Sequence, residues 1–155
     1  MLSTIGYEGA SLDDFVATLK LAEVNTLIDI RDRAQSRRPG FSKTALRVRL
    51  ESEGISYLHL KQLGDPKEGR DAARSGQMDK FRKIYGSVLE TEGALSAIDQ
   101  ILNLTESSSA CLLCYERNPH DCHRMLVSDL IERKHGLKAR HLGVRTCEPL
   151  QHQRR

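Results

Sequence analysis

Short apolar runs alternate with amphipathic segments along most of the chain, and this alternation constrains the fold more than any other feature. The runs are typical of buried strands, and we expect strands at residues 2–6, 24–30, 55–60, 110–115 and 137–144. Between them, apolar residues recur at helical spacing in residues 12–22, 43–53, 78–88, 95–102 and 126–135. Parallel strands need crossover connections, so this order predicts an α/β fold: a single three-layer domain, with a mainly parallel sheet of about five strands and helices on both faces.

The size of the chain, 155 residues, fits one domain. We place it at residues 1–145, followed by a polar, basic tail at 146–155 that we expect to be flexible. Residues 64–77 have no clear periodicity and predict a surface excursion or lid. No apolar run approaches the roughly 18 residues of a membrane span, and the N-terminus lacks the features of a secretory signal. We therefore expect a cytoplasmic protein with no membrane partner.

Open α/β sheets bind ligands at the carboxyl ends of their strands. The stretch from Ala110 to Arg124, ACLLCYERNPHDCHR, predicts such a strand end, because an apolar run breaks into a polar turn and then resumes at a helix start. We expect it to meet three other pieces there, which are residues 6–9, residues 29–31 with the basic loop behind them, and residues 59–63.

Cys122 is the strongest candidate for chemistry. It precedes the predicted helix, whose positive end favours a thiolate, and Arg124 and a protonated His123 would favour it further. Backbone N–H groups at the same helix start could hold a phosphate, sulfate or carboxylate. The alternative is that Cys122 only caps the helix, while Arg124 pairs with Glu116 or Asp29.

Four cysteines without a secretory signal argue against a structural disulfide framework and favour free thiols, metal ligands or redox groups. Cys114 and Cys122 could form a redox or sulfur-transfer pair. Against this, Cys114 lies at the end of an apolar strand, and small buried cysteines are common core residues. A zinc site from Cys111, Cys114, Cys122 and His123 is a further alternative. Its context is poor, because Cys111 and Cys114 point to opposite faces of a strand.

Carboxylates near the same strand ends could move protons if burial raises their pKa. Glu8 and Glu116 are the candidates, whereas Asp29 is expected to pair with Arg31. His59 is expected to be a core or rim histidine, and it joins Tyr7, Asp29 and Cys114 as a supporting residue.

A basic loop between Arg31 and Arg49 holds seven Lys or Arg residues against one acid. Such a run is often a solvated face. Alternatively, Arg31, Arg37 and Arg38 bind a phosphate-bearing ligand, or the loop contacts nucleic acid. Aromatic residues make up only 5% of the chain, and we find no nucleic-acid-binding motif.

Several motifs carry a family resemblance. They are Thr4-Ile5-Gly6-Tyr7-Glu8-Gly9, Ile28-Asp29-Ile30-Arg31, Arg37-Arg38-Pro39-Gly40-Phe41, Gly54-Ile55-Ser56-Tyr57-Leu58-His59-Leu60 with Leu63-Gly64, and Leu113-Cys114-Tyr115-Glu116 with Pro119 and Cys122-His123-Arg124. From Thr4 to about Val144 the chain resembles domain of unknown function family 488, a group of uncharacterised bacterial proteins. Tyr115 departs from the family pattern, which has a small residue such as Ala there. The resemblance implies an α/β fold and a shared polar site, and it brings no activity.

Our leading hypothesis is therefore an enzyme without a cofactor that binds a small anionic ligand, in which Cys122 is the thiolate and Glu8 and Glu116 move protons. Arg31, Arg37, Arg38, His123 and Arg124 would hold the anion. A non-catalytic nucleic-acid or nucleotide-binding module is the alternative, and a structural zinc protein comes third. The oligomeric state is not predicted.

Overall fold

The structure, a computed structural model, describes residues 1–145. Its strands are β1 (Leu2–Gly6), β2 (Thr26–Asp29), β3 (Ser56–His59), β4 (Ala110–Cys114) and β5 (Ala139–Leu142). Its α-helices are α1 (Leu12–Leu21), α2 (Lys43–Ser52), α3 (Lys67–Arg74), α4 (Met78–Leu89), α5 (Glu92–Ser107) and α6 (His123–His135). Two short 3-10 helices, η1 (Lys61–Leu63) and η2 (Pro119–Asp121), complete the described elements. The predicted tail and Cys147 lie outside the described residues.

The five strands form one parallel sheet in the order β3-β2-β4-β1-β5. The predicted α/β class and parallel sheet are therefore confirmed. β4 lies in the centre of the sheet, where all five of its residues are buried. β5 forms one edge of the sheet, and the charged residues Lys138 and Arg140 in this part of the chain are typical of an edge strand.

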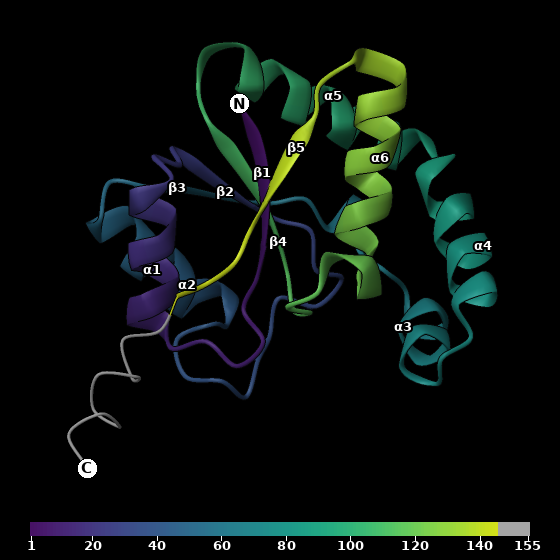
Figure 1. The fold of residues 1–155 in the computed structure, drawn as a ribbon, viewed down its shortest axis with the longest axis horizontal. Coiled ribbons are helices and arrows are strands. Elements are labelled where there is room, and N and C mark those ends of the chain that lie inside the picture. Colours follow the sequence, from purple (N-terminus) through teal and green to yellow (C-terminus); the bar gives the residue numbers. More distant parts are fainter. Residues whose placement is uncertain (146–155) are drawn as a thin grey trace.

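Helices cover both faces of the sheet, so the three-layer arrangement is also confirmed (Figure 1). On one face α1 and α2 pack against side chains of β1, β2 and β4 that include Ile5, Leu27 and Leu113. On the other face α4, α5 and α6 pack against Ile28 and Leu112. Successive residues of one strand thus enter opposite cores, as the pleat of a strand requires.

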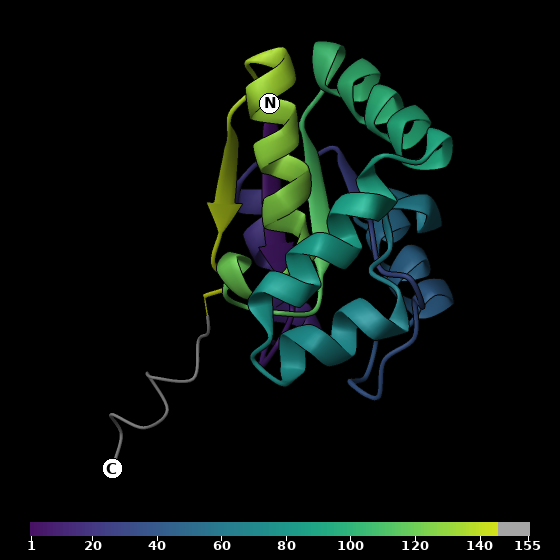
Figure 2. The same cartoon turned by 90° about the vertical axis from the view of Figure 1, so that its right-hand side faces the viewer.

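The segment expected to be a surface excursion or lid, residues 64–77, contains helix α3, which the sequence did not predict. Helix α3 buries only Gly69 and Ala72, which explains why no apolar stripe marked it in the sequence. It packs against α4, which in turn contacts α6 (Figure 2). This helix stands over the carboxyl ends of the strands and closes one side of the pocket described below. Among residues 1–145, no helix is long and apolar enough to cross a membrane.

Candidate functional site

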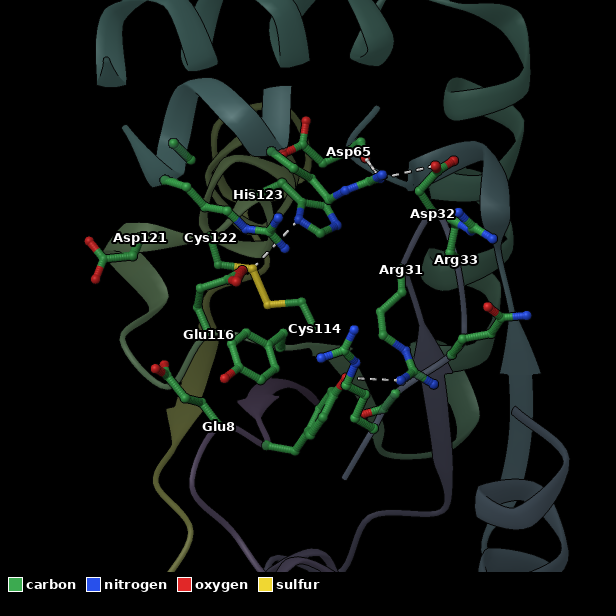
Figure 3. A pocket seen from close by; sticks show the side chains of 18 of the residues that line it. Glu8, Arg31, Asp32, Arg33, Asp65, Cys114, Glu116, Asp121, Cys122 and His123 are labelled. Carbon is green, nitrogen blue, oxygen red and sulfur yellow. Dashed lines mark hydrogen bonds and ion pairs between the residues drawn. A yellow bond between two sulfur atoms is a disulfide. The ribbon is translucent and has the colours of Figure 1, made fainter. Parts of the chain in front are cut away.

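A pocket of about 950 Å³ opens at the carboxyl ends of β1, β2 and β4. Three of the four predicted pieces line it, through Tyr7 and Glu8, through the loop after β2, and through the segment from Cys114 to His123 (Figure 3). The fourth piece does not. His59 lines a separate hollow, where its Nε2 lies 2.7 Å from the Arg31 carbonyl oxygen. A stretch that the sequence did not predict, from Asp65 to Met78 around α3, lines the pocket instead.

Two cysteine sulfurs lie in the wall of this pocket. Cys114 ends β4 and Cys122 is the N-cap residue of α6, and the two are joined by a disulfide with an S–S distance of 2.04 Å. Both residues are buried. The turn and the 3-10 helix η2 between them fold the chain back, so that a strand end and a helix start eight residues apart meet. The structure therefore brings together the two cysteines whose pairing the sequence left open.

His123 lies beside Cys122 and is held in one tautomer. Its Nε2 lies 2.8 Å from the Ile30 carbonyl oxygen, and a carbonyl can only accept, so Nε2 carries the proton. Nδ1 is then an acceptor, and it faces the Cys122 sulfur at 3.5 Å. Burial lowers the pKa of His123 to about 4. At neutral pH this side chain is uncharged, so the protonated His123 that we expected to hold an anion is not its resting form.

Arg124 is fully buried behind the disulfide and does not line the pocket. Its guanidinium donates to Thr4 Oγ1 at 3.1 Å, to Cys114 Sγ at 2.9 Å, to the Glu116 carbonyl oxygen, and to the Arg117 carbonyl oxygen at 3.1 Å. Within residues 1–145 it forms no ion pair, so the pairing with Glu116 or Asp29 that we considered is absent. Burial lowers the pKa of Arg124 to about 10, and the side chain remains a cation at neutral pH.

Arg31 and Asp29 form the ion pair that the strand end predicted. The guanidinium makes bonds of 2.9 and 2.7 Å to the two oxygens of the Asp29 carboxylate. It also donates to the Phe41 carbonyl oxygen at 2.8 Å and to the Tyr7 hydroxyl at 3.2 Å. Burial alone would lower the pKa of Arg31, but the pair with Asp29 raises it above its ordinary value. Most of the donors of Arg31 are thus engaged within the protein, which leaves little capacity for an anion.

Of the other arginines in the basic loop, some line the pocket and others bind elsewhere in the protein. Arg33 and Arg37 line the pocket, and Arg70 and Arg74 join them from α3. Arg38 does not line it, because its Nε donates to the Ala10 carbonyl oxygen. The nucleic-acid alternative depended on this loop acting as one surface, and it stays a prediction.

Acidic side chains occupy the same pocket. Glu8 and Glu116 lie on the side of the disulfide, opposite Arg31 and Arg33 (Figure 3). Glu8 Oε1 accepts from the Arg117 backbone N–H at 3.0 Å. Burial and, more weakly, the charge of Glu8 raise the pKa of Glu116. The pocket is therefore lined by acidic as well as basic side chains.

Asp65 also lines the pocket, and no sequence pattern predicted it. This residue is only 4% exposed, and burial raises the pKa of its carboxyl to about 7. The nearby charge of Arg70 acts in the opposite direction, and those of Glu116 and Asp32 add to the rise. The only signal in the sequence was an acid placed between Gly64 and Pro66 just before a helix, and nothing there indicates burial.

The four-residue zinc set is not assembled, so that alternative is wrong in the form predicted. Cys111 is a free cysteine in the opposite core, and burial raises the pKa of its thiol to about 12. Cys114, Cys122 and His123 do offer ligand atoms within 4.8 Å of one another. However, the two sulfurs are bonded to each other and His123 Nε2 donates to Ile30.

Comparison with known proteins yields one match. The family described as domain of unknown function DUF488 matches residues 11–131. Neither the curated proteins nor the solved structures include a significant match.

Proposed function

The chain belongs to the DUF488 family, and since that description assigns no reaction, we propose from the site that it is a thiol enzyme. In this proposal Cys114 and Cys122 alternate between dithiol and disulfide, and a ligand with an anionic group occupies the pocket beside them. The observation that carries the proposal is the sulfur pair itself, lodged in a pocket wall between a buried cation and a neutral imidazole.

Cys122 is proposed as the nucleophile that attacks the substrate. It stands at the N-terminus of α6 and lines the pocket, and its side chain makes no capping hydrogen bond. The positive end of the helix stabilises a thiolate at this position. In the dithiol form, Nδ1 of His123 would accept from the Cys122 S–H and hold the sulfur in place.

Cys114 is proposed as the resolving cysteine because Arg124 favours its thiolate. Every acceptor that Arg124 contacts is electrically neutral in the disulfide form. A buried cation without a counter-charge is costly. A thiolate on Cys114, whose sulfur lies 2.9 Å from Arg124 Nη1, would supply that charge when the disulfide opens.

The reaction is thiol–disulfide exchange. Cys122 loses its proton to water, and its thiolate attacks one sulfur of an anionic disulfide, R–S–S–R. A Cys122–S–S–R bond forms and R–S⁻ leaves. The Cys114 thiolate then attacks the Cys122 sulfur, which forms the intramolecular disulfide and releases the second R–S⁻. The cysteines lose two electrons and the substrate gains them, and a low-molecular-weight thiol returns the pair to the dithiol by the reverse steps.

Arginines at the rim of the pocket are proposed to hold the anionic group of the substrate. Arg33, Arg37 and Arg74 line it, and guanidinium groups bind carboxylates and phosphates through paired N–H donors. Arg31 and Arg124 are not assigned to this role, because their donors already serve the protein.

The test uses the anionic disulfide dithiobis(nitrobenzoate) on reduced protein in a Cys147→Ser background. We expect rapid release of two thionitrobenzoate ions per chain, with no adduct retained in the intact mass. Cys114→Ser should release one ion and keep a mixed disulfide, whereas Cys122→Ser should react slowly. Slow labelling at a single rate, with adducts retained on both cysteines, would contradict the proposal.

Arg124→Gln separates the two steps of the same experiment. Because Arg124 contacts Cys114 and not Cys122, the second release should slow while the first is unchanged. Arg117→Gln is the matched control, since Arg117 is exposed and contributes only backbone groups to this network.

A further inference from the structure

The Asp65 carboxyl is the one buried polar side-chain group that lacks a partner among residues 1–145. Its Oδ1 is buried without any hydrogen bond, and the residue lines the pocket while being 96% buried. A buried acceptor left unpaired costs about 1–3 kcal/mol. Neither carboxyl oxygen accepts a hydrogen bond among residues 1–145. Oδ1 itself faces Gly69, so a ligand in the pocket would supply a donor and a counter-charge to the carboxyl group as a whole.

The nearest cation does not satisfy this carboxyl. Arg70 Nη1 donates to the Asp65 carbonyl oxygen at 2.7 Å and to Asp32 Oδ2 at 3.0 Å. Arg70 thus fixes the Asp65 backbone and compensates the charge of Asp32, while the Asp65 carboxyl stays unpaired.

Helix α3 holds the carboxyl where it is. Asp65 Oδ1 packs directly against Gly69, and a Cβ at that position would overlap it. On the other side of Asp65, the Tyr85 hydroxyl anchors the chain by donating to the Leu63 carbonyl oxygen at 2.6 Å. The Asp65 carboxyl can therefore occupy this position only because residue 69 is a glycine.

Charges of both signs line the pocket. The acids are Glu8, Asp32, Asp65, Glu116 and Asp121, and the bases are Arg31, Arg33, Arg37, Arg70 and Arg74. Arg31 and Arg70 are already paired with acids, so the uncompensated bases lie on the rim and the uncompensated acids include Asp65 and Glu116. A ligand carrying only negative charge would leave the Asp65 and Glu116 carboxylates without a counter-charge.

We infer that the pocket binds a zwitterionic ligand, with an ammonium group on Asp65 and an anionic group on the arginine rim. The inference deepens the proposed function and rests on the same pocket. An ammonium supplies the donor that Asp65 lacks, as a hydroxyl would, and in addition the positive charge that Glu116 nearby also attracts. The raised pKa of Asp65 agrees with this reading, because the carboxyl would ionise fully only when a cation reaches it.

The test compares two probes that differ only in the ammonium group, O-phosphoethanolamine and ethyl phosphate. Binding is measured by calorimetry on the disulfide form, which separates the result from thiol chemistry. We expect wild-type protein to bind O-phosphoethanolamine about tenfold more tightly, a difference of about 1.4 kcal/mol. Asp65→Asn should remove this preference and leave the affinity for ethyl phosphate unchanged.

Two glycine variants provide a second, matched measurement. Gly69→Ala should displace the Asp65 carboxyl and reduce the preference, whereas Gly86→Ala should not, because a Cβ at Gly86 meets no atom within 4 Å. Equal affinity for both probes, a preference that survives Asp65→Asn, or binding of neither probe would overturn the inference. None of these outcomes would affect the thionitrobenzoate release from Cys122, so the two proposals can fail separately.

Discussion

At the scale of single residues, the site depends on charges held away from water. Arg124 and Asp65 are both buried, and neither has an ion-pair partner among residues 1–145. A buried ionisable group without an ion-pair partner changes its protonation state, or gains a counter-charge, when a reaction or a ligand brings an opposite charge close to it. The proposed chemistry uses both, since a thiolate on Cys114 would compensate Arg124 and a ligand ammonium would compensate Asp65.

Asp65 should make the stability of the protein depend on pH. Its folded-state pKa of about 7 lies above its unfolded value near 4, so its stabilising contribution is present at low pH and is lost as the pH rises through 7. Wild type should therefore lose about 2–3 kcal/mol between pH 5 and pH 8 relative to Asp65→Asn. Urea denaturation of both proteins at the two pH values measures this.

The comparison is made between variants so that every other titratable and charged group is the same in both proteins. Asp32, Arg70, Glu116 and Tyr85 surround the carboxyl and are common to both proteins. His123 acts in the opposite sense, since its folded-state pKa lies below the unfolded one. The same pH dependence in wild type and in Asp65→Asn would show that the carboxyl is not perturbed.

Residues whose neighbours are local in the chain could be placed from the sequence. Asp29 and Arg31 are two positions apart on a strand end, so their pairing could be predicted from strand geometry. Cys122 at a helix start was recognised for the same reason. The role of Asp65 could not be predicted, because its burial depends on Gly69 and on helix packing that no local pattern encodes.

At the scale of elements, the end of β1 must approach the segment after β4 very closely. A Cβ at Gly6 would overlap the Glu116 carbonyl oxygen and lie 2.8 Å from Arg124 Nη1. This carbonyl is one of the acceptors that hold Arg124. The absence of a side chain at Gly6 therefore permits the arrangement that places Arg124 behind Cys114.

Gly6→Ala should destabilise the protein by about 3 kcal/mol or more, because the overlap is with backbone and cannot be relieved by a side-chain rotation. Gly143→Ala is the control and should stay within about 0.5 kcal/mol of wild type, since a Cβ there meets no atom within 4 Å. Denaturant unfolding compares the two. Similar stabilities would contradict the close approach.

Helix α3 shows the limit of pattern recognition for elements. The helices with an apolar stripe, such as α1 and α4, were predicted close to their observed bounds. By contrast, α3 is eight residues long and mostly charged, and its helical state is stabilised by packing against α4 and by ion pairs such as Lys67–Asp71. An element that buries so little gives no periodic signal.

At the scale of the whole molecule, the fold class followed from alternation alone, but the strand order did not. The order β3-β2-β4-β1-β5 places β4 in the centre and brings the carboxyl ends of β1, β2 and β4 side by side (Figure 1). The approximate position of the site was therefore predictable. Its composition was not, because the disulfide and the wall formed by α3 are products of tertiary packing.

The central claim is that the pocket sulfurs are chemically reactive in a way that ordinary buried cysteines are not. The most direct measurement is the rate at which iodoacetamide alkylates each cysteine of the reduced protein at neutral pH, resolved by peptide mass. We expect Cys122 to react at least about tenfold faster than Cys111, whose thiol is buried in the apolar core. Inorganic phosphate should slow the reaction of Cys122, and prior oxidation should abolish it. Equally slow labelling of all four cysteines, unaffected by phosphate, would contradict the account.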